Sequence, residues 1–476
     1  MVINRELSIL MIGRLLQVVI ALVIIKIATK LLDASEMGNL YLIANITGFF
    51  SLFLINPIGQ YINRRTHQWY DESNLLNALF LYNLYVFFIA LFSIVIVNFL
   101  YYFNVGNSID LFHLSIFVAA FVYFNTWNQT IIPIINMLEK RIIFVLFTLF
   151  SQVLFLSLAY LFIRIFEVKA IFWFLGQSLA LGGVAFIAFI YFIKKIQNNF
   201  SYSVVCGMVK IDNFKNIIKF SFPLSIGVFF LWMQTQSYGI IIEKYIGSEF
   251  LGFFGVGLAV ATAISSSFES LVMQYIYPKM YKSMKDEKQF SDIISSTLNL
   301  IIPIYFLLAI FISFFAVFFV AILVDIKFYY SYIYTIFGAW TAFFIMSSNM
   351  MSNIAHARLK TKELVYSYAI GGVVTIVCLL GAVNSENYRW YVPLSLVLAS
   401  ILGFWVMFLR MNRIVKVKLK SENFYLVLFY SIPFTTSAFF YSHSKNFFYS
   451  ICIAAVFGIY FLYILSILIK KGEAID

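Results

Sequence analysis

The chain has 476 residues, of which 62% are hydrophobic and 11% are charged, and its formal net charge is +12. Soluble domains carry roughly 25% charged residues, so the composition excludes an ordinary soluble protein. Repeated long apolar runs instead predict an all-α polytopic membrane protein.

Several enzyme classes lack their motifs in this sequence. No G-x-x-x-x-G-K-[ST] segment is present, so ATP hydrolysis through a phosphate-binding loop is not expected. Cys206, Cys378 and Cys452 lie far apart without metal-ligand spacing, so we expect neither a disulfide nor a metal site. Since no long outer loop is predicted either, we expect no enzymatic activity and no cofactor.

The chain opens with a predicted hairpin of two membrane helices. The first spans about 7–32, a polar turn occupies 33–36, and the second runs from 37 to 65. About 20 apolar residues span the hydrocarbon core, and each later run approaches or exceeds this length. These runs lie at about 75–103, 109–136, 142–166, 168–193, 220–246, 250–277, 293–323, 329–354, 364–383, 391–411, 424–441 and 447–469. The total is fourteen helices, of which 424–441 is short and contains Pro433.

The distribution of Lys and Arg sets the expected orientation. With the N-terminus in the cytoplasm, 24 of the 33 basic residues fall on the cytoplasmic side and 7 on the outer side. The remaining two, Arg14 and Lys26, lie within the first helix. Cytoplasmic loops are enriched in basic residues, so both termini are predicted to be cytoplasmic. This placement explains the basic charge without a nucleic-acid partner, and the loops would contact anionic membrane lipids.

An internal repeat divides the chain. Met37-Gly38 and Gln60-Tyr61-Ile62 recur as Leu251-Gly252 and Gln274-Tyr275-Ile276, both shifted by 214 positions. A looser match relates 136–141 to 353–358. Two parallel six-helix repeats around a central cavity are a transporter architecture. The predicted parts are an N-terminal bundle at 1–193, a basic cytoplasmic linker at 194–219, a C-terminal bundle at 220–412, and two extra helices with a tail at 413–476.

Charged groups within the apolar helices are the first candidate site residues. A charge inside a membrane helix is costly and often marks a substrate pathway. Arg14 and Lys26 each lie about two turns from a helix end, so snorkelling to the headgroups is the alternative. Glu269 is the only acid that we place deep in an apolar helix, and Thr262 and Ser266 share its face. It is a candidate for proton or cation coupling, or else a structural hydrogen-bonding or ion-pairing group.

Polar stripes on three helices are candidate cavity linings. They comprise Asn45 and Asn56 on the second helix, Asn125 and Gln129 on the fourth, and Asn349 and Asn353 on the tenth, followed by His356. Small and amide side chains also connect membrane helices, so packing is the alternative. The fourth and tenth helices correspond in the repeat, which favours a hydrated cavity.

Five further segments stand out at the starts of the two repeats. They are Lys30-Leu31-Leu32-Asp33-Ala34-Ser35-Glu36-Met37-Gly38, Asn56-Pro57-Ile58-Gly59-Gln60, Phe220-Ser221-Phe222-Pro223-Leu224, Gly247-Ser248-Glu249-Phe250-Leu251-Gly252 and Tyr277-Pro278. These segments resemble those of the Wzx-type polysaccharide flippases, members of a superfamily that also contains multidrug and cation antiporters and lipid II flippases. The resemblance spans most of helices 1–10.

This resemblance implies a function in surface polysaccharide assembly, such as O-antigen, lipopolysaccharide or capsule. The implied cargo is an undecaprenyl-diphosphate-linked oligosaccharide, flipped across the bacterial cytoplasmic membrane by alternating access. Arg14, Lys26, Lys30 and Arg64 would then form a cationic cavity for the diphosphate. A polymerase and a chain-length regulator of the same pathway are possible partners. Two alternatives stay open: a multidrug or cation antiporter of the same fold, and a membrane-embedded polysaccharide polymerase or glycosyltransferase.

Overall fold

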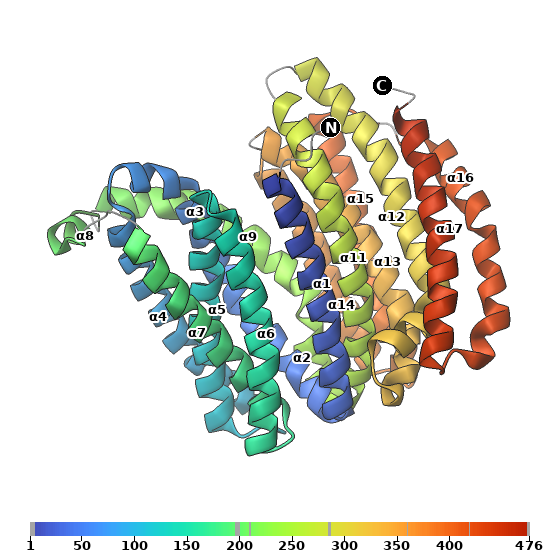
Figure 1. Cartoon of the computed structure of the whole chain (residues 1–476), viewed down its shortest axis with the longest axis horizontal. Helices are drawn as coiled ribbons and strands as arrows, with labels where there is room; N and C mark the ends of the chain where they lie inside the picture. Colours follow the sequence, from blue (N-terminus) through green and yellow to red (C-terminus); the bar gives the residue numbers. More distant parts are fainter. Residues whose placement is uncertain are drawn as a thin grey trace. The chain divides into compact units, whose positions relative to one another are not determined.

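The computed structural model describes residues 5–195, 200–208, 211–283, 287–358, 360–417 and 419–473. Regular structure in these ranges is helical, with short π- and 3₁₀-helical segments and no strand (Figure 1). The predicted all-α fold class is therefore confirmed. Lys210, Lys285 and Lys418, which the sequence assigns to cytoplasmic loops, lie outside the described residues.

Twelve helical segments in the described part of the chain are long and apolar enough to cross a membrane. Helices α5 (Leu111–Met137) and α13 (Tyr332–Ala357) have 27 and 26 residues but are not among the twelve. They coincide with the runs predicted at 109–136 and 329–354, and they contain the amide-rich stripes. The count of fourteen spans stays a prediction that depends on these two polar helices.

Contacts divide the chain into two compact units. Unit 1 contains the chain up to Ile24, Leu31–Trp232 and Ile242–Leu251. Unit 2 contains Ile25–Lys30, Met233–Ile241 and the chain from Gly252 onward. Helix α1 (Arg5–Leu31) therefore contributes residues to both units, and so do α9 (Ile211–Thr235), α10 (Tyr238–Tyr245) and α11 (Ser248–Ser283).

Long neighbouring helices make up most of unit 1. Helix α4 packs against α5, and α7 packs against both α5 and α6, as Figure 1 shows. Side chains such as Trp173, Phe174 and Phe192 of α7 are almost fully buried. The helices, besides α1 and α5, are α2 (Ala34–Phe49), a π-helical segment (Phe50–Ile55), α3 (Asn56–Asp71), α4 (Leu75–Tyr102), α6 (Arg141–Ile165), α7 (Ala170–Lys195), α8 (Tyr202–Met208), α9 (Ile211–Thr235) and α10 (Tyr238–Tyr245).

The first hairpin is tighter than predicted. Asp33 caps α2, because its carboxylate accepts a hydrogen bond of 2.8 Å from the backbone N–H of Glu36. The turn predicted at 33–36 therefore reduces to the residues before Ala34. The second helix also extends beyond its predicted end at 65 and finishes at Asp71, after the π-helical segment.

One predicted helix is interrupted. The sequence predicts a continuous helix over 220–246, but α9 ends at Thr235 and α10 begins at Tyr238. The Ser237 hydroxyl donates to the carbonyl of Met233 at 2.5 Å. The break falls in the polar stretch Gln234-Thr235-Gln236-Ser237, where serine and threonine hydroxyls compete with the backbone for helix carbonyls and so weaken the helix.

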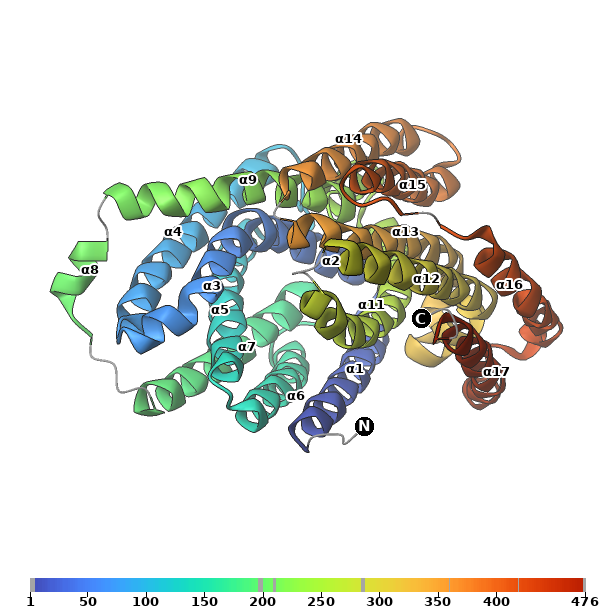
Figure 2. The same cartoon turned by 90° about the horizontal axis from the view of Figure 1, so that it is seen from above.

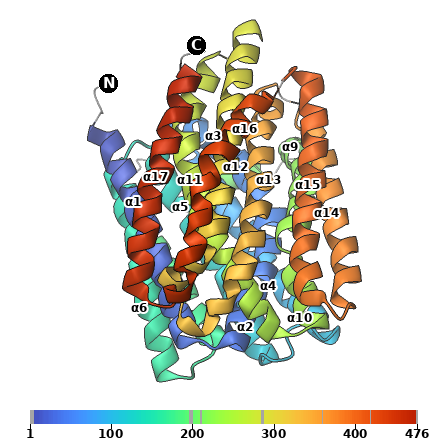
Figure 3. The same cartoon turned by 90° about the vertical axis from the view of Figure 1, so that its right-hand side faces the viewer.

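Unit 2 is built around α12. This helix packs against α13, α16 and α17, while α15 packs against α13 and α14 (Figure 2). Figure 3 shows α16 and α17 beside α12. Phe311 of α12 stacks on Phe461 of α17, and Phe315 of α12 contacts Phe457 of α17 with tilted rings, each pair at 4.8 Å between ring centroids. The helices are α11 (Ser248–Ser283), α12 (Glu287–Leu323), a 3₁₀ segment (Ile326–Ser331), α13, α14 (Lys362–Val383), α15 (Tyr388–Ile414), α16 (Ser421–Ser431), a second 3₁₀ segment (Ile432–His443) and α17 (Phe447–Glu473).

The span predicted at 424–441 consists of two helix types. The α-helix α16 ends at Ser431, and a 3₁₀ segment continues to His443. Pro433 cannot donate a backbone hydrogen bond and ends the α-helical pattern. Ser421–His443 nevertheless satisfies the length and hydropathy expected of a membrane span.

A very close approach in unit 1 gives the first prediction. A Cβ atom added to Gly38 of α2 would lie 1.8 Å from the carbonyl oxygen of Ser248, the first residue of α11. Ser35 also contacts Ser248 through their hydroxyls at 2.7 Å. Gly38→Ala should therefore force the two backbones apart and destabilise the protein by about 1–3 kcal/mol, the usual effect of overpacking.

Thermal unfolding of the detergent-solubilised protein measures this effect. Gly183→Ala, in the exposed face of α7, is the matched control because an added Cβ meets no atom within 4 Å. We expect a lower melting temperature for Gly38→Ala only. Equal melting temperatures for the two variants would show that the Gly38 contact is not required.

The predicted orientation yields a second test. A cytoplasm-specific reporter fused to the C-terminus should be active, because the distribution of basic residues predicts that both termini are cytoplasmic. A reporter inserted between α14 and α15, next to Asn384, should be active only outside. Cytoplasmic activity of both fusions would reveal an error in the number of membrane crossings.

Candidate functional site

A polar cavity lies within unit 2, between α11, α13 and α14, and has a volume of about 420 Å³. Most of its wall is hydroxyl, amide, carboxyl, imidazole or phenol, and the cavity is open, because Ser266 and His356 are exposed. The lining residues are Ser266, Glu269, Ser270, Met273, Asn349, Ser352, Asn353, His356 and Tyr368.

Helical spacing explains how two segments place these side chains together. On α11 the lining residues follow the pattern i, i+3, i+4, i+7 from Ser266 to Met273. On α13 they follow the same pattern from Asn349 to His356. Residues at these separations share one face of a helix, so each helix turns a polar strip toward the cavity. Tyr368 of α14 completes the wall.

Glu269 is fixed by a partner on the opposite helix. The Asn349 side-chain amide donates to Glu269 Oε1 at 3.2 Å. The backbone carbonyl of Asn349 in turn accepts from the Ser352 hydroxyl at 2.7 Å and from the Asn353 amide at 3.3 Å. These bonds satisfy several polar groups that would be costly to leave unpaired in an apolar bundle. A carboxyl, an imidazole and several amides around one space can bind a proton, a cation or the hydroxyl groups of a sugar.

The structure brings together only some of the predicted site residues. Glu269, Asn349 and Asn353 lie in the cavity, and the strip on α13 also includes His356. Sequence reasoning missed Ser270 and Ser352, although both occupy the same helical faces. It also missed Tyr368, for which the sequence contains no signal, since the packing of α14 alone brings it there.

The four predicted cationic residues do not line this cavity. Arg14 is exposed on α1, and its guanidinium donates to Gln17 Oε1 at 3.1 Å. Lys30 is exposed near the end of the same helix. Arg64 is exposed on α3, 5.7 Å from the ring of Phe220. The role of these residues in binding substrate stays a prediction.

Lys26 is held within unit 2. Its ammonium group donates to the backbone carbonyls of Ala321, at 3.2 Å, and Val324. It also lies 5.5 Å from the ring centroid of Phe447. Carbonyls at a helix C-terminus lack intrahelical partners and attract cations, so these contacts give Lys26 a structural role at the end of α12. Any contact with substrate is a further prediction.

The remaining amides are distributed over unit 1. Asn45 is buried, and its backbone carbonyl accepts from the Trp232 indole at 3.0 Å. Asn56 is half-buried and accepts from Gln60 at 3.2 Å. On α5, Asn125 is half-buried and Gln129 is exposed. Their predicted place in a cavity lining stays a prediction.

Sequence analysis also overlooked a second half-buried acid. Glu243 of α10 accepts a hydrogen bond of 3.1 Å from the backbone N–H of Gly106. Like Glu269, it is therefore a half-buried carboxyl within an apolar run that has a hydrogen-bond partner on another segment. The local sequence did contain a signal, because Glu243 follows three isoleucines in an apolar run, but nothing in it predicts the partner Gly106, which is 137 positions away.

The helical fold and its polar cavity define a polytopic membrane protein with a transporter architecture. A family model described as polysaccharide biosynthesis protein matches residues 3–284, more than half of the sequence. The chain belongs to this family. A comparison with curated proteins finds no match.

Solved structures share the fold at low sequence identity. The lipid II flippase MurJ, in an inward closed conformation, matches with a TM-score of 0.71 and 13% identity, over 98% of this chain and 99% of that chain. An inward-facing multidrug resistance MATE family transporter of the MOP superfamily matches with a TM-score of 0.54 and 14% identity, over 86% of this chain and 98% of that chain. A mutant of the Vibrio cholerae MATE transporter VcmN matches with a TM-score of 0.55 and 13% identity, over 86% of this chain and 95% of that chain. The chain therefore has the fold of these flippases and transporters.

Proposed function

We propose that this protein flips an undecaprenyl-diphosphate-linked oligosaccharide across the bacterial cytoplasmic membrane by alternating access, for surface polysaccharide assembly. The observation that carries the proposal is family membership over residues 3–284. The fold supports it, because the lipid II flippase MurJ has the same architecture over nearly its whole length. A transporter of this kind is not an enzyme. The same pathway supplies the polymerase and the chain-length regulator as partners.

The polar cavity in unit 2 supports a hydrophilic cargo or coupling ion. Moving a sugar hydroxyl from water into an apolar medium without a hydrogen-bond partner costs several kcal/mol. Amides, hydroxyls and a carboxyl in the wall offer replacement partners. We place the oligosaccharide, or the ion that drives its movement, in contact with Glu269 and the strip on α13. Alternating access would involve the two predicted six-helix bundles at 1–193 and 220–412. The linker at 194–219 joins them, and 413–476 follows the second bundle.

Cationic side chains on α1 and α3 would attract the diphosphate. Arg14 and Arg64 present guanidinium groups, which bind phosphate oxygens in bidentate geometry. Lys30 adds a charge near the end of α1, and Lys26 adds one if substrate displaces its carbonyl partners. In an apolar passage such charges are worth more than in water, because the local dielectric constant is low.

A second candidate is a multidrug or cation antiporter. Two structures with a comparable fold are MATE transporters, and Glu269 is a carboxyl that a proton or cation could neutralise. Here the cavity would hold the exported cation itself. A membrane-embedded polymerase or glycosyltransferase has less support, since the matched structures with this fold are a flippase and transporters.

The third prediction concerns Glu269. Glu269→Gln keeps the shape and removes the charge, so transport should lose its dependence on the proton or cation gradient. We expect flipping about tenfold slower, equivalent to about 1.4 kcal/mol in the barrier. The measurement is transport in proteoliposomes under imposed pH and ion gradients.

Glu249→Gln is the matched control, because Glu249 is exposed near the start of the same helix. It should transport like the unmodified protein. If Glu269→Gln also kept full transport and full gradient dependence at equal reconstitution, Glu269 would have no coupling role.

The fourth prediction concerns Arg14. Arg14→Ala should sharply reduce polymer export while the protein still inserts into the membrane. Arg14→Lys should be intermediate, because the charge stays but the bidentate geometry is lost. Arg14→Glu should be the weakest, because a carboxylate repels a diphosphate. Surface polysaccharide in a strain lacking its own copy, normalised to membrane protein, measures the effect.

Arg164→Ala provides the control for this series. Arg164 is also exposed on a membrane helix and also has a partner within its own helix, Tyr160 at 3.3 Å. Its loss should leave export unchanged. Equal export from Arg14→Ala and Arg164→Ala would identify Arg14 as an interfacial anchor.

A further inference from the structure

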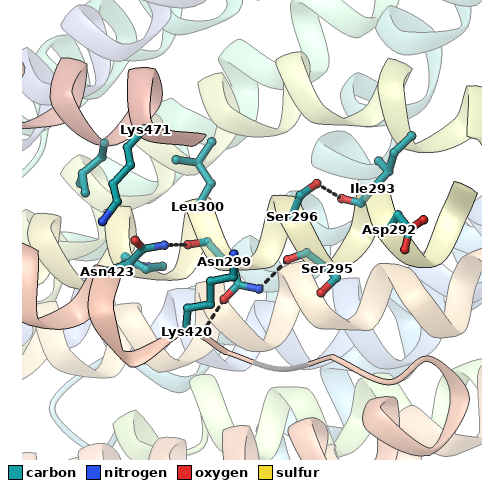
Figure 4. A pocket seen from close by; sticks show the side chains of 11 residues that line it. Asp292, Ile293, Ser295, Ser296, Asn299, Leu300, Lys420, Asn423 and Lys471 are labelled. Atoms are coloured by element: carbon teal, nitrogen blue, oxygen red, sulfur yellow. Dashed lines mark hydrogen bonds between the residues drawn. The ribbon is translucent and has the colours of Figure 1, made fainter. Parts of the chain in front are cut away.

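A second polar cavity of about 330 Å³ lies in unit 2, at one end of α12, α16 and α17 (Figure 4). It shares no residue with the cavity around Glu269. Its wall combines two lysines, one carboxylate, amides and hydroxyls with several apolar side chains. The lining residues are Asp292, Ile293, Ser295, Ser296, Asn299, Leu300, Pro303, Lys420, Asn423, Leu468 and Lys471.

A buried asparagine at its centre joins α12 to α16. The Asn299 side chain accepts from the backbone N–H of Lys420 at 2.6 Å and donates to the carbonyl of Ser295 at 2.9 Å. Its own carbonyl lacks the usual helical partner, because Pro303 follows four residues later and has no N–H. The amide of Asn423 fills this position at 2.8 Å. The wall that supports Lys420 is therefore a fixed structure.

The cavity lies where three membrane spans end. Lys420 immediately precedes the span Ser421–His443, and Lys471 ends the span Phe447–Lys471. The third span, Gln289–Leu323, begins just before Asp292. Helix α12 has 37 residues, or about 55 Å at 1.5 Å per residue, whereas the hydrocarbon core is only about 30 Å thick. Its first turns therefore project into the headgroup region.

We propose that this cavity binds the headgroup of an anionic glycerophospholipid. Lys420 and Lys471 would neutralise the phosphodiester, and basic pockets between membrane helices are known to bind such headgroups. In Figure 4 the Lys471 side chain extends toward Asn423, beside Asn299. Ile293, Leu300 and Leu468 form an apolar part of the same wall. That part fits the glycerol backbone and the first acyl carbons, which a soluble phosphate lacks.

Asp292 is the one carboxylate in this wall, and it is exposed. Its charge opposes an anionic ligand, so the two lysines leave a net charge of +1 in the lining. Removal of this carboxylate should strengthen binding of an anionic lipid. Neutral substitutions of Asp292 and of the lysines should therefore change the affinity for an anionic lipid in opposite directions.

Native mass spectrometry of the full-length protein in detergent tests the proposal, with phosphatidylglycerol as the probe and phosphatidylcholine as the neutral lipid. The double variant Lys420→Gln, Lys471→Gln should weaken phosphatidylglycerol binding about tenfold or more, because each lysine contributes appreciably to anionic headgroup binding. The matched control is Lys416→Gln with Lys470→Gln, which removes the same charge from exposed positions outside the lining. It should change binding by less than about twofold.

Asp292→Asn should tighten phosphatidylglycerol binding severalfold, and a misfolded variant could not produce this gain. Inorganic phosphate at millimolar concentration should not displace the lipid. Equal weakening by the two double variants, or no gain from Asp292→Asn, would overturn the proposal. Displacement by inorganic phosphate would instead identify a site for soluble anions and would also overturn it.

Discussion

A polar group inside an apolar helix bundle needs a hydrogen-bond partner, and where its own helix offers none, a side chain of a neighbouring helix supplies it in unit 2. An unpaired buried group costs 1–3 kcal/mol or more, which is a large share of the stability of a protein. Glu269 on α11 has the Asn349 amide on α13 as its partner. The carbonyl freed by Pro303 in α12 has the Asn423 amide on α16 as its partner. Each bond fixes the rotation of one helix relative to its neighbour.

Both cavities of unit 2 depend on these bonds. The bond between Glu269 and Asn349 turns the polar strips of α11 and α13 toward one space, and the bonds of Asn299 position the residues around Lys420. The apolar side chains of α12 lie between these polar sites and pack on α13, α16 and α17. The apolar core of unit 2 therefore carries two cavities with polar groups in their walls, and these groups can contact charged or hydroxylated ligands while the core stays buried.

The two proposals assign different charges to different tasks. Glu269 is an acid in a hydrogen-bonded wall and is suited to a proton, a cation or sugar hydroxyls. Lys420 and Lys471 lie at the ends of membrane spans and are suited to the phosphate of a surrounding lipid. Lys26 differs from both, because its ammonium group donates to carbonyls at the end of α12, and it could meet a diphosphate only if substrate displaced them. The partners of each basic residue therefore decide which role is proposed for it.

The sequence by itself determined the all-α membrane class, most helix positions and the polar faces of α11 and α13, because hydrophobicity and helical periodicity are properties of consecutive residues. Hydrophobicity alone did not predict the break between α9 and α10, although the stretch Gln234-Thr235-Gln236-Ser237 is polar. Nor could it show that Tyr368 joins the cavity, that Glu243 meets Gly106, or that Lys26 caps α12. Those outcomes depend on which helices pack together, and a contact between residues of separate helices has no local signal in a single sequence.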